Sequence, residues 1–378
     1  MEPVRALPLL YQNGMTELKK IAALCNYELL PERVGGMDYF FWQFDSKCKA
    51  NGIQVDWFFP NQSDHGEYAT LTVFDSGYES IENYFLNFCK TNEITYTHII
   101  THFIELCTPF FYRIKQLSKA RIIAVDHNPR PLSGYPLKKR IEKRIKGILF
   151  SRYIAVFVGV SDFSKLELIK EFGSQIGNKS IVILNGLDNS KFRKKLNFEF
   201  NNKFIVASHL RRDKGIQDLI VAVKYLTDNH EYDFLIDIYG SGYFEMELKK
   251  MIEDYSLQKY FDFKGSVANL NEIYCNYDYL IHPSHGETFC YSVVESLMCD
   301  LPVITTKDRG NVLKLVENNK NGFLFEAGQV NQLKEILVEI LNNDSRLTNC
   351  SVGNKKVNTL TLVTMVDHHL ALVLPNKF

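Results

Sequence analysis

From about Lys203 onward, short β-branched or aromatic runs alternate with segments of helical period, and this alternation restricts the fold more than any other feature of the chain. In the first helical segment, GIQDLIVAVKYL (215–226), apolar residues recur at three- and four-residue spacing. The strand candidates are FIVAS (204–208), FLIDIYG (234–240), YFDFKG (260–265), YLIHPS (279–284), PVITT (302–306) and GFLFEA (322–327). A parallel sheet with crossover helices requires this order, so we predict a doubly wound α/β domain from 203 to about 343.

The first half of the chain repeats the alternation less regularly. Its strand candidates are KIAALC (20–25), IQVDWFF (53–59), THIIT (97–101), RIIAVDH (121–127), IAVFVGVS (154–161) and SIVILNG (180–186). Its helix candidates are FFWQFDSKCKANG (40–52) and KKRIEKRIKGILF (138–150). This half also reads as α/β, and the polar, aperiodic stretch 185–203 is the predicted linker.

A length of 378 residues suits two domains. We place an N-terminal Rossmann-like domain at 15–190, a C-terminal one at 191–345, and a closing helix within 346–378 that packs toward the first domain. Residues 1–14 have no clear period and are left outside the fold. Residues 1–195 hold 26 basic and 20 acidic residues, and residues 196–378 hold 18 and 24. This opposite sign suits two lobes that face each other across a cleft.

Composition excludes several classes of protein. An apolar share of 46% and a charged share of 23% are typical of a packed soluble chain. Lys plus Arg and Asp plus Glu both number 44, so no overall field draws the chain toward nucleic acid or an anionic membrane. The eight cysteines form no CxxC pair, which indicates reduced, mostly buried thiols of a cytosolic protein. No apolar stretch is long enough to span a membrane, and no secretion signal begins the chain, so we expect a cytoplasmic protein.

The sharpest local pattern is HPSHGETFCYSVVESLMC (282–299), in which a strand, a glycine-containing loop and a helix follow one another. A helix that begins directly after a strand offers unpaired backbone N–H groups to a phosphate. Glu287 and Glu295 bracket this position, and at 1.5 Å rise per residue their spacing reaches roughly 12 Å, comparable to a sugar, a diphosphate and a ribose in line. The alternative is that both glutamates merely cap and solvate a helix.

A second pattern points to the same edge of the sheet, and a third lies in the first half of the chain. HLRRDKGIQDLI (209–220) places cations where a strand ends and a helix begins, and ligands of open α/β sheets bind at that edge. A solvated basic turn is the alternative. In RVGGMD (33–38), Gly35 and Gly36 let a backbone approach a phosphate where a Cβ would block it, and a plain turn is the alternative.

Taken together, these segments resemble the GT4-type retaining glycosyltransferases (glycosyl transferases group 1), which have the two-lobed GT-B fold. The resemblance runs from about Lys20 to Leu372 and is strongest in the second half. The segments that carry it are GVSDFSK (159–165), VILNGLD (182–188), HLRRDKGI (209–216), FDFKGSV (261–267), PSHGETFCYSVVESLMCDLPVITT (283–306) and NGFLFEAG (321–328). It implies two Rossmann-like domains that face a cleft.

The resemblance assigns roles in the glutamate segment. Glu287 matches the family glutamate near the donor sugar and is a catalytic candidate. Glu295 matches the glutamate that holds the nucleotide ribose. The backbone of Thr288, Phe289 and Cys290 is expected to lie along the sugar and the phosphates.

Other site residues follow from the same resemblance. Lys214 matches the lysine that contacts the diphosphate and is a catalytic candidate. The family arginine five residues earlier is His209 here, and Arg211 is the candidate to replace it. Val267 of FDFKGSV is placed on the donor side.

The first half contributes the remaining site candidates. Gly35 and Gly36 resemble the family's phosphate-approaching glycine loop. His127, at the end of RIIAVDH, matches the histidine at the reaction centre, although a lone strand-end histidine is more often structural. His102 is a weaker candidate on the acceptor side.

The resemblance also implies a reaction. A sugar passes from a nucleotide diphosphate donor, a UDP- or GDP-sugar that is a substrate and not a cofactor, to a hydroxyl of a glycan or lipid-linked acceptor in surface polysaccharide or lipid-linked glycan assembly. Anomeric configuration is retained. The chain has no Asp-x-Asp motif, so we expect no metal dependence.

Two alternatives come from other classes. An NAD-dependent two-domain oxidoreductase would explain GSGYFE (240–245), but Glu245 stands where the dinucleotide fingerprint needs its third glycine. A non-catalytic sugar-nucleotide-binding protein would explain His209 in place of arginine.

LKKRIEKRIKGILFSR (137–152) contains seven basic residues and one acidic residue, with Leu137, Ile141, Ile145 and Leu149 at four-residue spacing. We favour an ordinary helix whose apolar side faces the core and whose basic side is solvated. Peripheral contact with an anionic membrane through the outer face is the second interpretation.

Overall fold

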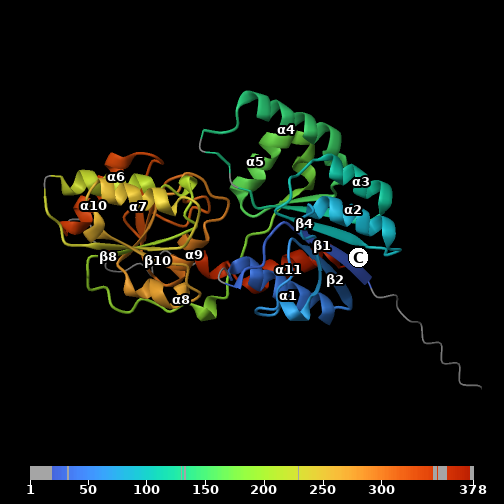
Figure 1. Cartoon of the computed structure of the whole chain (residues 1–378), viewed down its shortest axis with the longest axis horizontal. Coiled ribbons are helices and arrows are strands. Elements are labelled where there is room, and N and C mark those ends of the chain that lie inside the picture. The colour runs from blue at the N-terminus through green and yellow to red at the C-terminus, as the bar shows by residue number, and fades with distance from the viewer. Residues whose placement is uncertain are drawn as a thin grey trace, which may run out of the picture.

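The structure is a computed structural model of the chain and describes residues 19–31, 34–128, 130–131, 133–228, 230–343, 347 and 356–374. The predicted domain start at Met15 and Cys350 lie outside these residues. The described cysteines are all free, and five of them, at positions 25, 48, 107, 290 and 299, are buried. The chain forms two lobes that lie side by side (Figure 1).

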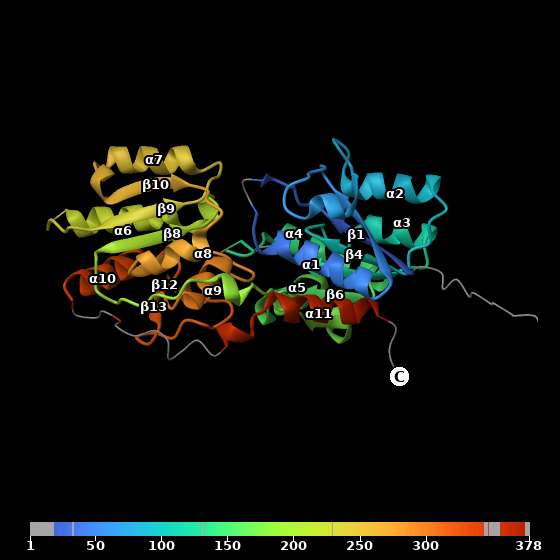
Figure 2. The same ribbon diagram turned by 90° about the horizontal axis from the view of Figure 1, so that it is seen from below.

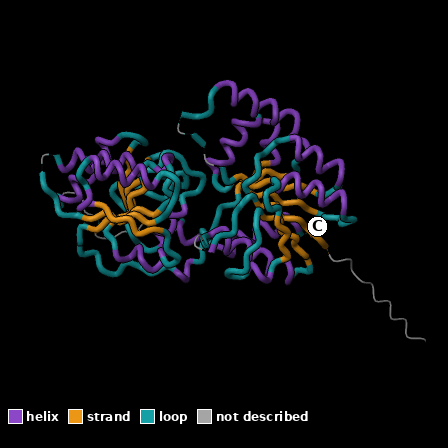
Figure 3. The backbone as a smooth tube through the Cα atoms, in the orientation of Figure 1, coloured by secondary structure: helices purple, strands orange, loops and turns teal. Residues whose placement is uncertain are grey.

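The first lobe is a parallel sheet between layers of helices (Figure 3). Its strands are β1 Lys19–Cys25, β2 Ile53–Phe59, β3 Thr72–Asp75, β4 His98–His102, β5 Arg121–Asp126, β6 Val156–Gly159 and β7 Ser180–Val182. Its helices are α1 Gly36–Ala50, α2 Ile81–Thr91, α3 Pro109–Leu117, α4 Leu137–Phe150 and α5 Asp162–Phe172. The strand order is β3-β2-β1-β4-β5-β6-β7. Sequence reasoning missed β3, because this short edge strand has little buried apolar surface.

The second lobe repeats the design with six strands in the order β10-β9-β8-β11-β12-β13. The strands are β8 Lys203–Ala207, β9 Leu235–Tyr239, β10 Phe261–Gly265, β11 Tyr279–His282, β12 Val303–Thr306 and β13 Gly322–Phe325. The helices are α6 Ile216–Thr227, α7 Glu245–Asp254, α8 Leu270–Ile273, α9 Tyr291–Met298 and α10 Val330–Leu341. The predicted fold class, two Rossmann-like doubly wound domains, is confirmed.

Both sheets reverse their strand order at an inner strand, because β1 pairs with both β2 and β4, and β8 with both β9 and β11. The buried strands are rich in Ile, Val and Phe, as expected where helices cover both faces. A ligand crevice forms where strand order reverses, outside the carboxyl ends of the strands. The fold therefore brings two such edges toward the space between the lobes.

The last helix, α11 (Leu362–Val373), returns to the first lobe and lies alongside α1 (Figure 2). His369 of α11 packs on Phe40 of α1 with ring centroids 4.7 Å apart. Where the chain crosses back, Leu187 donates its N–H to the Leu360 carbonyl and accepts from the Leu362 N–H, both at 3.0 Å. The outgoing and the returning segments thus pair with each other between the lobes.

The orientation of α4 corrects one prediction. Leu137, Ile141, Ile145 and Leu149 are 69%, 52%, 51% and 49% exposed, so the expectation that they face the core is wrong. The buried residue of α4 is Gly147, where a Cβ would lie 1.9 Å from the Phe172 carbonyl oxygen of α5. This close crossing fixes which side of the helix faces the protein.

Among the described residues, no helix combines the length and the apolar character that a membrane crossing requires.

Candidate active site

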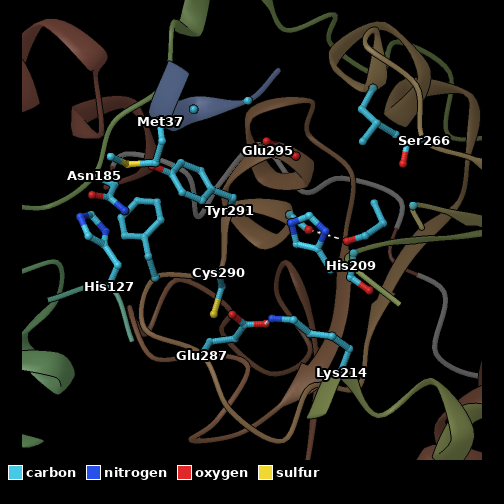
Figure 4. A pocket seen from close by; sticks show the side chains of 18 of the residues that line it. Met37, His127, Asn185, His209, Lys214, Ser266, Glu287, Cys290, Tyr291 and Glu295 are labelled. Atoms are coloured by element: carbon cyan, nitrogen blue, oxygen red, sulfur yellow. Dashed lines mark hydrogen bonds and ion pairs between the residues drawn. The ribbon is translucent and has the colours of Figure 1, made fainter. Parts of the chain in front are cut away.

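A cavity of about 740 Å³ lies between the lobes and is lined by loops at the carboxyl ends of strands of both sheets. It gathers most of the predicted site residues. These are Gly35, Gly36, His127, His209, Lys214, Val267, Glu287, Thr288, Phe289, Cys290 and Glu295. In Figure 4, His127 and His209 lie on opposite sides of the cavity, and Glu287 and Lys214 point toward one another.

Lys214 and Glu287 form an ion pair at one end of the cavity, with Nζ and Oε1 2.6 Å apart and both side chains about nine-tenths buried. Gly215 allows the loop that carries Lys214 to approach the loop that carries Glu287. Its φ of +71° is left-handed, and a Cβ there would lie 2.0 Å from the Pro283 carbonyl oxygen. The loop after β8 therefore rests on the loop after β11, which aligns the lysine with the glutamate.

The charge of this pair is set by its surroundings. Burial is the largest single influence and would raise the pKa of Glu287, but the Lys214 ammonium and His282, whose Nε2 lies 3.1 Å from Oε1, together outweigh it. The pKa of Glu287 is therefore held well below its usual range. The site contains a carboxylate and an ammonium before any ligand binds.

Glu295 lies in the second turn of α9, where the Tyr274 hydroxyl donates to its Oε2 at 2.9 Å. Burial raises the pKa of Glu295, and the Tyr274 hydrogen bond opposes this only in part. Cys290 forms the N-cap of α9 with a φ of +69° and lines the cavity. The N-terminus of the eight-residue helix α9 therefore opens into the cavity beside Glu287.

Hydrogen bonds to Asp38 hold the glycine loop of the first lobe in place. Asp38 accepts from the Gly35 N–H at 2.8 Å and from the Tyr27 and Tyr68 hydroxyls at 2.9 and 2.6 Å. A Cβ on Gly36 would lie 2.6 Å from Cε1 of Tyr291, a residue of the second lobe. The absent side chain at Gly36 thus makes room for the other lobe, whereas Gly35 has open space around its Cα.

His127 reaches the cavity from the end of β5. Its Nε2 lies 3.0 Å from Nδ1 of the buried His102, and the Phe103 ring stacks on it at 4.3 Å. The second lobe touches the same segment, because Thr288 donates its hydroxyl to the His127 carbonyl oxygen at 3.3 Å. Burial, and to a smaller extent the nearby His369, lower the pKa of His127 to about 3. His127 is therefore a neutral group near pH 7.

We expect this neutral histidine to make the fold acid-sensitive. The pKa of His127 is near 6.5 in the unfolded chain and about 3 in the folded protein, so the unfolded chain takes up the proton first as pH falls. This contribution to stability is full above about pH 7 and declines as pH drops below about 6.5, by about 2 kcal/mol at about pH 5. Denaturant unfolding at several pH values measures it. His127→Phe should flatten the pH dependence by this amount, and replacement of the exposed His230 by Gln should not. If the free energy of unfolding depended on pH equally in both variants, His127 would not be the source of the acid sensitivity.

Two candidates lie off the cavity wall. Arg211 is not among the lining residues, and its guanidinium pairs with Asp213 at 3.2 Å. His102 is 1% exposed and lies behind His127. In this structure His102 contacts a cavity residue and does not reach the cavity itself.

Three lining residues carry atoms that could ligate a metal. Donor atoms of His282, Glu287 and Cys290 all lie within 4.8 Å of one another. The Lys214 ammonium already contacts Glu287, however, and burial raises the pKa of the Cys290 thiol well above its usual value. A neutral thiol beside an ammonium is a poor donor set for a cation.

Sequence reasoning missed several lining residues. They include Tyr27, Phe103, Asn185, His282 and Tyr291. A signal for some was present, because His282 ends β11 and Asn185 follows β7, and the carboxyl ends of parallel strands meet at one edge. Tyr291 gave no such signal, since its role comes from contact with Gly36 in the other lobe.

Known proteins share parts of this sequence. Residues 188–357 match the family model described as glycosyl transferases group 1. An uncharacterized glycosyltransferase of Methanocaldococcus jannaschii is 27% identical over 54% of the chain and 56% of its own length. The poly(ribitol-phosphate) alpha-N-acetylglucosaminyltransferase of Staphylococcus aureus is 26% identical over 34% of the chain and 26% of its own length. The chain thus spans about half of the first relative and a quarter of the second.

Solved structures match over nearly the whole chain. Anabaena HepE in complex with UDP-glucose has a TM-score of 0.71 at 19% identity, covering 94% of this chain and all of that one. Sucrose-phosphate synthase from Thermosynechococcus elongatus has a TM-score of 0.74 at 16% identity, covering 94% and 98%. The fold agrees with these GT-B structures, and residues 188–357, less than half of the chain, are similar to the glycosyl transferases group 1 family.

Proposed function

We propose that the protein is a retaining glycosyltransferase that moves a sugar from a nucleotide diphosphate donor to a hydroxyl acceptor. The observation that carries this proposal is a single cavity in which Lys214, Glu287, Glu295 and the N-terminus of α9 meet the glycine loop of the opposite lobe. Cations and helix N-termini stabilise diphosphate, and carboxylates accept hydrogen bonds from sugar hydroxyls. The family match favours this function over the oxidoreductase alternative.

In the proposed reaction, the bond between the sugar C1 and the diphosphate oxygen breaks, and its electron pair stays on that oxygen. Lys214 and the backbone N–H groups at the start of α9 stabilise the developing charge. The acceptor hydroxyl forms the new bond to C1 on the same face and gives its proton to the departing phosphate. Glu287 is held by Lys214 and His282 and is therefore assigned to the donor sugar rather than to nucleophilic attack. His127 positions the sugar as a neutral hydrogen-bonding group.

We place the donor nucleotide on the second lobe. Glu295 accepts from the ribose hydroxyls, and Val267 and His209 lie on the same wall of the cavity. We place the acceptor on the first lobe. The acceptor is proposed to be a surface glycan or a lipid-linked precursor, since the relatives include a capsular polysaccharide glycosyltransferase of Staphylococcus aureus and a poly(glycerol-phosphate) alpha-glucosyltransferase of Bacillus subtilis.

Nucleoside diphosphates should stabilise the protein against heat. A ligand at about one hundred times its Kd adds about 2.7 kcal/mol to the free energy of unfolding. A melting series with UDP, GDP, ADP and their sugar conjugates measures this and identifies the base. Glu295→Ala should weaken nucleoside diphosphate binding about ten- to a hundred-fold, because a charge-assisted hydrogen bond is lost.

The exposed Glu253→Ala provides the control and should keep wild-type binding. Stabilisation by NAD in place of any nucleoside diphosphate would overturn the proposal. Binding of a nucleotide sugar without hydrolysis or transfer to any acceptor would instead favour the non-catalytic alternative.

A further inference from the structure

The outer side of α4 carries an exposed apolar row. We define the α4 face as Leu137, Ile141, Ile145, Ile148 and Leu149, which are between 49% and 69% exposed. The row follows one side of a helix that runs along the outer edge of the first lobe (Figure 1). Apolar side chains gathered in this way on a solvent-exposed surface mark an interaction site.

The inner side of α4 is polar, which is the reverse of an ordinary surface helix. Lys143 reaches inward to Glu171 of α5 with Nζ and Oε2 2.9 Å apart. The same glutamate accepts from Nε of the buried Arg130 at 2.9 Å. Turning the α4 face inward would break this buried ion network, which is destabilising because a buried charge is left without its partner. It would also displace Gly147 from its crossing with α5. The outward direction of the apolar row is therefore built into the lobe.

Cations surround the α4 face. Residues 137–152 hold seven basic residues and one acidic residue, Glu142. Lys139 and Lys146 neutralise that glutamate at 3.0 and 2.8 Å. Lys138, Arg140 and Arg144 are exposed and alternate with the apolar residues along the helix. The surface thus offers hydrocarbon and positive charge together.

We propose that the α4 face docks onto a membrane surface rich in anionic lipid, with α4 lying in the plane of the interface. The apolar row enters the boundary between headgroups and acyl chains, and the flanking Lys and Arg side chains contact lipid phosphates. A second copy of the chain fits this surface less well, because a two-fold contact would bring two basic helices together. A nucleic acid would satisfy the cations and leave the apolar row in water.

Co-sedimentation of the full chain with vesicles tests docking without reference to activity. Wild type should bind phosphatidylglycerol-containing vesicles at least about ten-fold more strongly than pure phosphatidylcholine vesicles, and about 0.5 M salt should weaken binding. The double variant Ile141→Ser, Ile145→Ser and the double variant Lys138→Glu, Arg140→Glu should each reduce binding about ten-fold or more. These side chains are exposed, so folding should be unaffected. Tyr225→Ser with Met246→Ser removes two exposed apolar residues of the second lobe and should bind as wild type does.

Equal binding to both kinds of vesicle, or equal binding by all variants, would overturn the proposal. A dimer in light scattering that the Ile141→Ser, Ile145→Ser variant loses would assign the surface to a second copy and overturn it too. Hydrolysis of the nucleotide sugar in solution should be unchanged in the α4 variants. Loss of vesicle binding with intact hydrolysis separates a failure of docking from a failure of the proposed function.

Discussion

Replacing Lys214 by alanine should lower kcat by about two to three orders of magnitude, the loss that follows removal of one preorganised group that stabilises transition-state charge. Lys214 lies in the cavity with its Nζ 2.6 Å from Glu287 and is about nine-tenths buried, so water screens its charge weakly. The charge acts most strongly when the sugar bond breaks and the diphosphate becomes more negative. The loss should therefore appear in kcat more than in KM. Release of nucleoside diphosphate from the nucleotide sugar measures both.

The same substitution leaves Glu287 buried beside His282 without its ammonium partner, so folding must be checked separately. Combining Lys214→Ala with Glu287→Gln removes the unpaired charge and should recover stability without recovering turnover. Lys249→Ala, in an exposed i,i+4 ion pair on α7, should leave both unchanged. Full turnover by Lys214→Ala and by Glu287→Gln would show that the pair is outside the reaction.

Gly215→Ala should destabilise the fold by about 3 kcal/mol or more. Two costs add at this position: a left-handed φ of +71°, worth about 1–2 kcal/mol for a residue with a Cβ, and a contact of that Cβ at 2.0 Å from the Pro283 carbonyl oxygen. The contact cannot relax through a side chain, because the obstacle is backbone. Relief requires the loop after β8 to leave the loop after β11, which would also separate Lys214 from Glu287.

Gly52 provides a matched control. Its φ is +70°, and a Cβ there would meet nothing within 4 Å. Gly52→Ala should therefore cost about 1–2 kcal/mol, the backbone part alone. Denaturant unfolding followed by far-UV circular dichroism compares the two variants. Equal losses would show that the contact with Pro283 contributes nothing.

The sequence predicts that Lys214 and Glu287 lie at one edge of the sheet, because both follow strands of one parallel sheet, but it does not predict their ion pair. The two residues are 73 positions apart, but they follow β8 and β11, which are neighbours in the sheet. Alternation of strands and helices identified both strands, and parallel strands end at one edge. Of the residues placed at that edge, His209, Lys214 and Glu287 line the cavity, whereas Arg211 does not.

Contacts that depend on how whole elements meet could not be predicted. Gly36 has no side chain because Tyr291 of the other lobe occupies that space, and nothing near Gly36 in the sequence encodes this. Four-residue spacing in α4 shows that Ile141 and Ile145 share a side of the helix, but the period does not say whether that side faces the protein. The crossing at Gly147 decides it, through the backbone of α5.

The paired crossing of the chain between the lobes determines how the molecule can move. The outgoing segment at Leu187 and the returning segment at Leu360 and Leu362 are hydrogen-bonded to each other, so they form one two-stranded strap instead of two separate tethers. Sliding one lobe past the other would shear these hydrogen bonds, whereas swinging about the strap preserves them. The lobes should thus open by rotation about this paired segment, and the amide hydrogens of Leu187 and Leu362 should stay protected from exchange during that motion.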